Sequence, residues 1–355
     1  MKKLVIFTLI LLVSVAGWIG VQNLSFSSVH MPSEQGVDKL EPDSEDETIE
    51  AETDEPETKE KEEPASQEGW MGKTSRELMD TMGEPDRKDK SAYGYTWWVY
   101  EQPTTYLQFG IAEGKVVTWV GTGDINHMSD YSIGQPYDEV SDVAPFSETL
   151  TLETEGTYTF ELTEVDLAQR PLVKLDDETY AQLYFDTVTR KLSSIRVMSP
   201  EVLLILQPYR VTYRGELHEP PFMSEEEWKT VQAGNEQQIM TITNKIRERH
   251  SKSKLEWSKL AANVAYAHSK DMKSENYFSH HSQNGDGLKE RLEKGDVHYV
   301  RAGENIAAQY IDAAAAVNGW LNSEGHREAL LDGAYTHLGV GVHRDYYTQN
   351  FLTIP

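Results

Sequence analysis

The chain has no cysteine among its 355 residues, and this absence excludes several kinds of site. Disulfide frameworks, zinc ribbons, iron–sulfur clusters and thiol nucleophiles all need cysteine. Basic residues are also scarce, since 33 Lys and Arg stand against 59 Asp and Glu, for a net charge of −26. Because binding to a phosphate backbone needs clustered Lys and Arg, we expect no nucleic-acid partner. Any chemistry must come from histidine, carboxylate, hydroxyl or main-chain groups.

The beginning of the chain has the pattern of a targeting segment. Lys2 and Lys3 precede a run without charge over residues 4–21. Small residues at 14–16 suit cleavage, yet a run of about 18 residues also approaches the length that spans a bilayer. Residues 1–22 are therefore predicted to be a signal peptide or a membrane anchor, and the folded part is expected outside the cytoplasm, secreted or anchored at the membrane's outer face.

The next segment lacks what a folded core requires. Between residues 33 and 68 the sequence holds 16 Asp and Glu, three Lys and no aromatic residue. Such a segment cannot bury enough apolar surface to offset the entropy lost on folding. We predict a disordered acidic linker over residues 23–69, extended by the repulsion between its charges.

Two similar blocks follow each other in residues 70–213. The first predicts a short helix that opens within residues 72–75 and closes at Gly83 and Pro85. Three strands and a hairpin turn are predicted after it, at residues 93–100, 104–111, 115–121 and Glu113-Gly114. The second predicts a helix over 137–143, and its segment 179–183 resembles residues 105–109 of the first. We interpret the region as a duplicated helix-plus-sheet unit, with chance similarity between two amphipathic hairpins as the alternative.

A second folded region is predicted over residues 222–355. Proline and glycine in residues 207–221 indicate a boundary before it, and Ser224 and Glu227 have the spacing of a helix capping box. Periodic apolar residues predict three helices and two strands, over 225–249 with an interruption near Gly234, 255–276, 313–331 with an interruption at Gly325, 338–343 and 346–353. Helices flanking a sheet favour an α-β-α sandwich, and the chain as a whole is predicted to be α+β.

Histidines gather in this second region, where eight of the eleven occur. His280 follows the second helix, Glu304 is predicted at a loop-to-helix turn, and His326 within or beside the third helix. Two imidazoles and a carboxylate are the ligands of an open zinc site and equally the parts of a general acid–base pair. The sequence has no His-Glu-x-x-His helix and no Gly-x-Ser-x-Gly elbow, so the enzymes of those two classes have no support. Scattered structural histidines are the alternative to a shared site.

Other polar residues near these three receive more modest roles. His268 is predicted on the surface of its helix or as a cap, with support of the site as the alternative. His281 is expected in solvent. Arg327 is interpreted as structural, and Asn305 is expected to orient its own loop through side-chain hydrogen bonds.

Six ordered motifs within roughly residues 236–355 resemble the bacterial CAP domains, a superfamily of cysteine-rich secretory, antigen 5 and pathogenesis-related 1 proteins. The motifs are residues 255–272, Tyr277-Phe278-Ser279-His280, Gly303-Glu304-Asn305-Ile306-Ala307, Trp320-Leu321-Asn322-Ser323-Glu324-Gly325-His326-Arg327, Gly339-Val340-Gly341 and Tyr347-Thr348-Gln349-Asn350-Phe351. The region before them is similar to the CAP-associated N-terminal domain of extracytoplasmic proteins in Bacillus-like bacteria, through Gly72-Lys73, Gly83-Glu84-Pro85 and Trp97-Trp98-Val99-Tyr100.

The resemblance implies a cleft lined by two histidines and two acidic residues, sometimes holding zinc or another divalent cation. His280 and Glu304 match the first histidine and the first acid. Tyr346 stands where the eukaryotic motif His-Tyr-Thr-Gln has histidine, and because tyrosine is the poorer ligand near neutral pH, His326 is the candidate replacement. The candidate metal ligands are therefore His280, His326 and Glu304, and the other candidate cleft residues are Glu324, as second acid, Tyr346 and Asn305.

Two functions stay open at this point. In the first, an extracytoplasmic module binds a peptide, a lipid or another envelope component in its cleft. In the second, His280, His326 and Glu304 form a hydrolytic site, metal-assisted or not, for peptide or cell-wall substrates. Binding is the preferred interpretation, because the sequence identifies no nucleophile or base and the family is known mainly for secreted interaction roles. Fold alone does not decide, since function must be argued from the site.

Overall fold

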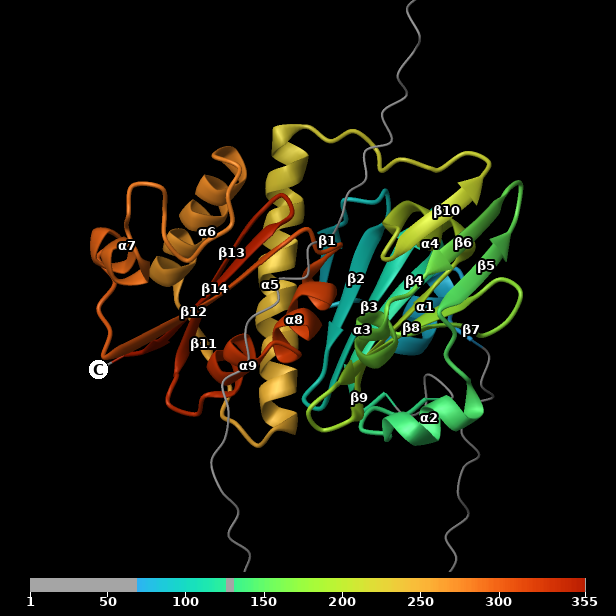
Figure 1. Cartoon of the computed structure of the whole chain (residues 1–355), viewed down its shortest axis with the longest axis horizontal. Coiled ribbons are helices and arrows are strands. Elements are labelled where there is room, and N and C mark those ends of the chain that lie inside the picture. Colours follow the sequence, from blue (N-terminus) through green and yellow to red (C-terminus); the bar gives the residue numbers. More distant parts are fainter. Residues whose placement is uncertain (1–68, 126–130, 355) are drawn as a thin grey trace, which may run out of the picture. The chain divides into compact units, whose positions relative to one another are not determined.

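Three β-sheets, of seven, three and four strands, organise the described part of the chain, and helices pack between the seven-stranded and the four-stranded sheet (Figure 1). The computed structural model describes residues 69–125 and 131–354. The predicted signal peptide or anchor and nearly all of the predicted acidic linker lie outside the described residues. Within the described part of the chain, no helix is both long enough and apolar enough to cross a bilayer.

The first half of the described chain contains α1 (Ser75–Met82), β1 (Arg87–Lys90), β2 (Thr96–Glu101), β3 (Thr105–Ala112), β4 (Lys115–Gly123), α2 (Tyr137–Val143), β5 (Thr149–Glu153), β6 (Thr157–Glu161), α3 (Glu164–Gln169), β7 (Leu172–Lys174), β8 (Tyr180–Asp186), β9 (Lys191–Met198), α4 (Pro200–Leu206) and β10 (Arg210–Arg214). The second half contains α5 (Glu225–Arg249), β11 (Glu256–Trp257), α6 (Lys259–Ser274), α7 (Leu288–Lys294), β12 (Arg301–Ala308), α8 (Ala313–Leu321), α9 (Glu324–Leu331), β13 (His337–His343) and β14 (Tyr346–Thr353).

The first half builds a seven-stranded antiparallel sheet with an internal symmetry. Its strand order is β1-β2-β3-β4-β9-β8-β7, so the last strands of the two similar blocks, β4 and β9, pair at the centre. The register shifts before Ile111 in β3 and before Phe185 in β8, positions separated by the same 74 residues as the two similar segments. Single bridges tie the residue before α1 to the start of β4 and the residue before α2 to the start of β9. These paired features support the duplicated unit.

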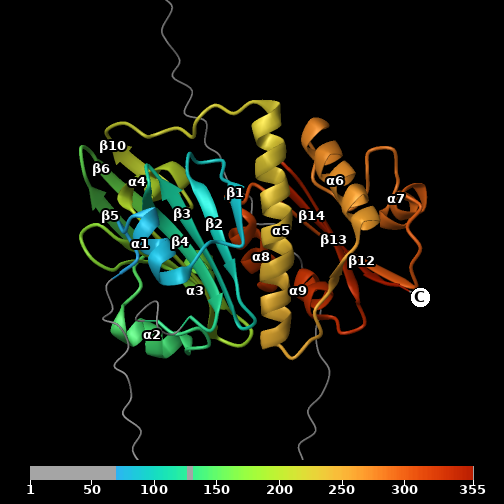
Figure 2. The ribbon, with the colours of Figure 1, turned by 180° about the vertical axis from the view of Figure 1, so that it is seen from behind.

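The two faces of this sheet pack against different partners. Helices α1 and α2 cover one face through Leu78 and Val140, and Figure 2 shows α1 lying there. The other face contributes Trp97 to a core that also contains Ile242 of α5 and Trp320 of α8. Because one continuous core joins both halves, the two predicted regions pack together through buried apolar surface.

The second half is an α-β-α sandwich, which confirms the predicted fold and the α+β class. Its sheet has the order β11-β13-β14-β12, with β12 at an edge. Helices α6 and α7 lie on one face, and α5, α8 and α9 lie on the other (Figures 1 and 2). Helix α5 therefore contacts β13 of this sheet as well as β1, β3 and β4 of the N-terminal sheet.

Close packing requires glycine where helices approach strands, as two contacts illustrate. A Cβ at Gly341 of β13 would overlap the main chain of α6 at Ala265 and Tyr266, so α6 lies directly on the strand. In α5, a Cβ at Gly234 would lie 2.8 Å from Cβ of Asp89 in β1. The predicted interruption near Gly234 is therefore wrong, because this glycine serves the approach of a strand rather than a break in the helix.

Other expectations hold in part. The Ser224–Glu227 capping box and the turn at Glu113-Gly114 are confirmed. The helix predicted over 255–276 begins only at Lys259, because residues 256–257 form β11 and pair with β13. The helix predicted over 313–331 breaks after Leu321 rather than at Gly325, and β10 lies inside the predicted boundary at 207–221, paired with β6.

We predict that Gly341→Ala destabilises the protein by about 3 kcal/mol, the upper end of ordinary overpacking costs, because α6 must move away from β13. Gly333→Ala is the control, since the nearest atom of the described residues is Cδ of Lys252 at 4.0 Å. Urea unfolding of both variants measures the difference. Equal midpoints for the two variants would contradict the packing argument.

Candidate functional site

A buried carboxylate on an edge strand is the centre of the site. Glu304 lies in β12, opposite Asn350 of β14, and its side chain is 3% exposed. This region was predicted to be a loop-to-helix turn; residues 301–308 instead form a strand that pairs along its full length with β14. The strand fixes the direction of the carboxylate, because successive side chains of a strand point to opposite faces of the sheet.

Two side chains engage the two oxygens of this carboxylate. Nδ1 of His280 lies 2.9 Å from Oε1, and Nη2 of Arg291 lies 2.6 Å from Oε2. A third donor is Asn350, whose amide nitrogen reaches Oε2 at 3.2 Å in the orientation that also lets its oxygen accept from Ala265. Burial favours a raised pKa for Glu304, but the hydrogen bond from His280 and the charge of Arg291 outweigh it and lower the pKa below its ordinary value.

Arg291 also fixes the main chain that carries His280. Its Nη1 donates to the carbonyl oxygens of His280 at 2.8 Å and Asp286 at 3.1 Å, while its side chain is only 8% exposed. Arg291 lies on α7, which the sequence analysis did not identify. A signal was present, because residues 288–294 are strong helix formers between two glycines, with Glu290 at the capping position.

His268 contacts the loop that carries His280. Its ring is buried on α6, and Nε2 lies 3.0 Å from the carbonyl oxygen of Ser279. The preferred prediction of a surface or capping role is therefore wrong, and the supporting role is the one observed. Because a carbonyl only accepts, Nε2 carries the proton. Burial lowers the pKa of His268, in keeping with a neutral ring.

His326 approaches His280 around the edge of β12. Their ring centroids lie 6.4 Å apart, with the planes tilted by 46°. His326 comes from α9, on the opposite face of the sheet from α6 and α7, and its carbonyl accepts from Asn305 Nδ2 at 3.0 Å. Burial and then the neighbouring His280 lower the pKa of His326. The site therefore combines a neutral imidazole at neutral pH with a second imidazole oriented by a carboxylate.

The remaining candidate residues lie further away or point elsewhere. Glu324 is exposed in the first turn of α9, and its carboxylate takes part in none of the hydrogen bonds or ion pairs found among the described residues. Tyr346 shares the sheet face of Glu304 but packs against Met272 and Ile306, four residues, or about 13 Å, along β14 from Asn350. His281 is exposed, as expected.

A three-ligand metal centre does not fit this arrangement. In residues 69–125 and 131–354, no group of three or more metal-ligating side chains is placed to hold an ion. Both oxygens of Glu304 are engaged, and the guanidinium of Arg291 beside them opposes a divalent cation. The ligand set of His280, His326 and Glu304 thus stays a prediction, with Glu304 its weakest member.

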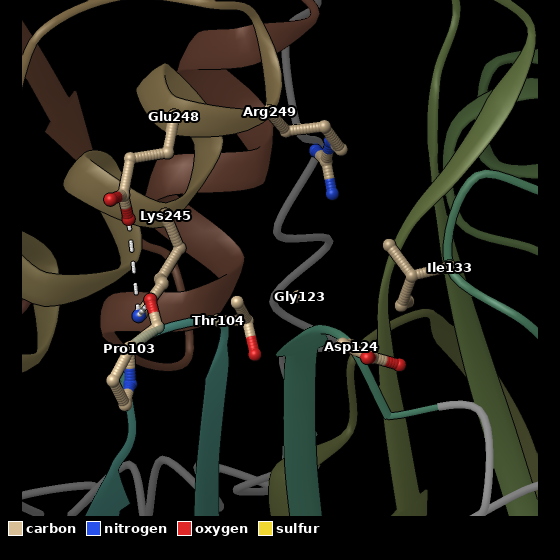
Figure 3. A pocket seen from close by; sticks show the side chains of 8 residues that line it. All are labelled: Pro103, Thr104, Gly123, Asp124, Ile133, Lys245, Glu248 and Arg249. Carbon is tan, nitrogen blue, oxygen red and sulfur yellow. Dashed lines mark hydrogen bonds and ion pairs between the residues drawn. The ribbon is translucent and has the colours of Figure 1, made fainter.

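A separate pocket of about 370 Å³ lies at the C-terminal end of α5 (Figure 3). Its cationic side chains already have partners, since Lys245 donates to the carbonyls of Gln102 and Pro103 and Arg249 donates to Ser193. The predicted site residues are not among those that line it in the described part of the chain. We therefore take the residues around His280, rather than this pocket, as the candidate functional site.

We predict that Glu304→Gln lowers stability by roughly 3 kcal/mol at neutral pH, because it leaves the buried Arg291 without its charge partner. The folded-state pKa of Glu304 is lowered, so its contribution is complete above the unfolded value of about 4.3 and is lost as the pH falls through the folded value. Urea unfolding between neutral and acidic pH should show the gap closing in acid. The exposed Glu293→Gln is the control, and a gap of constant size would contradict the ion pair.

A second prediction concerns zinc. Protein dialysed after exposure to zinc should retain less than one ion per chain, and Glu304→Gln should leave that amount unchanged, since Glu304 is already engaged. Elemental analysis of both proteins measures this. One zinc retained per chain and lost in Glu304→Gln would overturn our view that the site does not fit a three-ligand centre.

Comparison with known proteins places both halves of the chain. Residues 71–209 match the family described as CAP-associated N-terminal, and residues 240–354 match the cysteine-rich secretory protein family. The chain is 49% identical over 288 residues to YlbC of Bacillus subtilis, named an uncharacterized membrane protein, and the match covers 80% of this chain and 82% of that protein.

Solved structures show the same architecture. An extracellular protein containing an SCP domain from Bacillus anthracis matches with a TM-score of 0.78 and 42% identity, over 83% of this chain and 99% of that one. A cysteine-rich secretory protein from Staphylococcus aureus matches with a TM-score of 0.71 and 25% identity, over 80% of this chain and 91% of that one. The chain therefore belongs to the bacterial CAP-domain proteins that carry a CAP-associated N-terminal domain.

Proposed function

We propose that this CAP-domain protein acts outside the cytoplasm and binds a cell-envelope ligand, a peptide or a lipid, through the imidazoles of His280 and His326. The observation that carries the proposal is that His280 is both exposed to solvent and oriented by a buried carboxylate. Its side chain is 50% exposed, while its Nδ1 is held by the buried Glu304 at 2.9 Å. One ring nitrogen is thus fixed inside the protein, and Nε2 is left to meet a ligand.

The surroundings suit recognition better than turnover. The positive charge of Arg291 compensates the negative charge of Glu304, so Glu304 orients His280 rather than acting as a free base. His326 supplies a second ring, and Phe278, two residues before His280 in the sequence, is a large apolar side chain that is 52% exposed. A few oriented polar groups next to apolar surface are typical of sites that bind small or extended ligands.

The location outside the cytoplasm rests on two kinds of support. The sequence begins with the pattern of a signal peptide or anchor, followed by an acidic linker. YlbC is named a membrane protein, and the Bacillus anthracis relative is described as extracellular. A ligand of the cell envelope is the class that a protein in this place would meet, with the N-terminal segment as its contact with the membrane if it remains uncleaved.

Hydrolysis is the second candidate function, and one observation favours it. A histidine whose Nδ1 donates to a carboxylate is the base-and-orienter pair of many hydrolases. In such a reaction His280 would take a proton from water at Nε2, and His326 would bind the substrate. The substrates would be the same envelope peptides or cell-wall fragments.

The decisive experiment follows the ring signals of isotope-labelled histidine in the full chain. Purified Bacillus subtilis cell-wall fragments, vesicles of anionic lipid and a defined peptide mixture are added separately. One class should shift the signals of His280 and His326, and His280→Gln should weaken binding of that class about tenfold, as expected for loss of one hydrogen bond of about 1.4 kcal/mol.

His281→Gln is the matched control, because this neighbouring ring is exposed and should leave the affinity unchanged. Mass spectrometry of the same mixtures tests for cleavage products. Turnover that is lost in His280→Gln and Glu304→Gln but kept in His281→Gln would replace binding by hydrolysis. If no class shifts either ring, the proposed site is wrong.

A further inference from the structure

Residues of the N-terminal domain form hydrogen bonds with the turn between α8 and α9, the helix that carries His326. Helices α8 and α9 are joined at Asn322, whose Oδ1 accepts from the main-chain nitrogen of Thr187 at 2.8 Å and from its hydroxyl at 2.9 Å. Nδ2 of Asn322 donates to the carbonyl of Phe185 at 2.7 Å. Both ends of this amide are thus bound by residues 185–187, where β8 leaves the N-terminal sheet.

An ion pair holds the first turn of α9 against the same segment. Arg327 donates to both carboxylate oxygens of Asp186, at 2.8 and 3.0 Å, in the two-pronged geometry that fixes orientation as well as distance. The Asp186 side chain is 3% exposed and that of Arg327 14%. Although burial favours a raised pKa, the neighbouring ring of His250 and the hydrogen bonds from Arg327 hold the pKa of Asp186 well below its ordinary value.

Further contacts orient the Asp186 carboxylate. Its Oδ1 accepts from the main-chain nitrogens of Val188 at 3.0 Å and Thr189 at 3.2 Å, and the ring of His250 lies 3.2 Å from Oδ2. The carboxylate therefore cannot turn to follow Arg327. If α9 moved, the pair would break and separate a buried carboxylate from its compensating positive charge, which is strongly unfavourable.

The neighbour of Arg327 in the sequence is His326. Consecutive residues of a helix point about 100° apart, so one turn of α9 presents Arg327 to the N-terminal domain and His326 to His280. From the other side, Asn305 beside Glu304 donates to the carbonyl of His326 at 3.0 Å. The position of His326 is thus defined between the N-terminal domain and β12.

We infer that Asp186, Thr187 and Asn322 are positioning residues for the His280–His326 site, and that the N-terminal domain completes a site whose own residues all lie in the CAP domain. This inference deepens the proposed function, because it concerns the same site. It differs from simple adhesion between domains, which would stabilise the protein without setting the distance between the two rings.

The test compares two buried aspartates of the N-terminal sheet in the full chain. Asp186→Asn keeps the shape and the acceptor oxygen but removes the charge facing Arg327. Asp89→Asn is the control, because Asp89 also pairs with an arginine, Arg87, and contacts the CAP domain through Gln238, on α5 rather than on α9. Ring signals of labelled His280 and His326 are recorded for each variant without ligand.

We expect both variants to lose stability, and only Asp186→Asn to shift the His326 signal and, through the ring contact, that of His280. Amide exchange at Arg327, whose nitrogen donates to Ser323, should also become faster in that variant alone. Unchanged ring signals in Asp186→Asn, or equal shifts in Asp89→Asn, would overturn the inference.

A milder variant keeps the test decisive if Asp186→Asn does not fold. Thr187→Val removes only the hydroxyl that donates to Asn322 and should shift the His326 signal in the same direction by a smaller amount. No shift there would also count against the inference. Since no ligand is present, a negative result leaves the binding experiment untouched, and the two proposals fail separately.

Discussion

The burial of the Glu304 carboxylate is the constraint on which the site depends. A buried charge without partners is so unfavourable that other elements must supply compensating groups. Helix α7 brings Arg291, the loop before it brings His280, and β14 brings Asn350. Each of these groups comes from a different segment, so a single acidic side chain on an edge strand determines how three parts of the fold meet.

The groups that compensate the Glu304 charge also fix the loop that carries the exposed His280 ring. Arg291 cancels the charge of Glu304 and holds the carbonyl of His280, while His268 holds the preceding carbonyl of Ser279. The loop is therefore fixed at two successive carbonyls as well as by the ring nitrogen of His280. A ligand that meets Nε2 of this ring encounters a group that need not be ordered on binding, which lowers the entropy lost.

Sequence reasoning found His280 and Glu304, which contact each other, and His326 near His280, but not the groups that hold them. His280, Glu304 and His326 were identified from motifs and residue type, and the sandwich was identified from helical periodicity. The strand character of residues 301–308 was missed, because a Gly-Glu-Asn run has low strand propensity and only pairing with β14 overrides it. His268 was misjudged because a histidine at an apolar helix position does not reveal what covers it.

The packing of the two regions was beyond sequence reasoning for a physical reason. Proline and glycine at 207–221 mark a change of chain direction, yet they carry no information about which faces meet afterwards. In the structure α5 and α8 lie between two sheets, and a buried pair of Arg196 and Asp312 crosses from one region to the other. Periodicity identifies an apolar face on a helix. It does not reveal that a helix such as α5 packs against strands of two different sheets.

The N-terminal domain holds the site without covering it. Half of the His280 side chain stays exposed with this domain in place, while Asp186 is buried against Arg327 of α9. Because packed elements move as units rather than deform continuously, displacement of residues 185–187 would carry the first turn of α9 with it. By our inference, this domain sets the separation of the two imidazoles, while half of the His280 side chain stays exposed to a ligand.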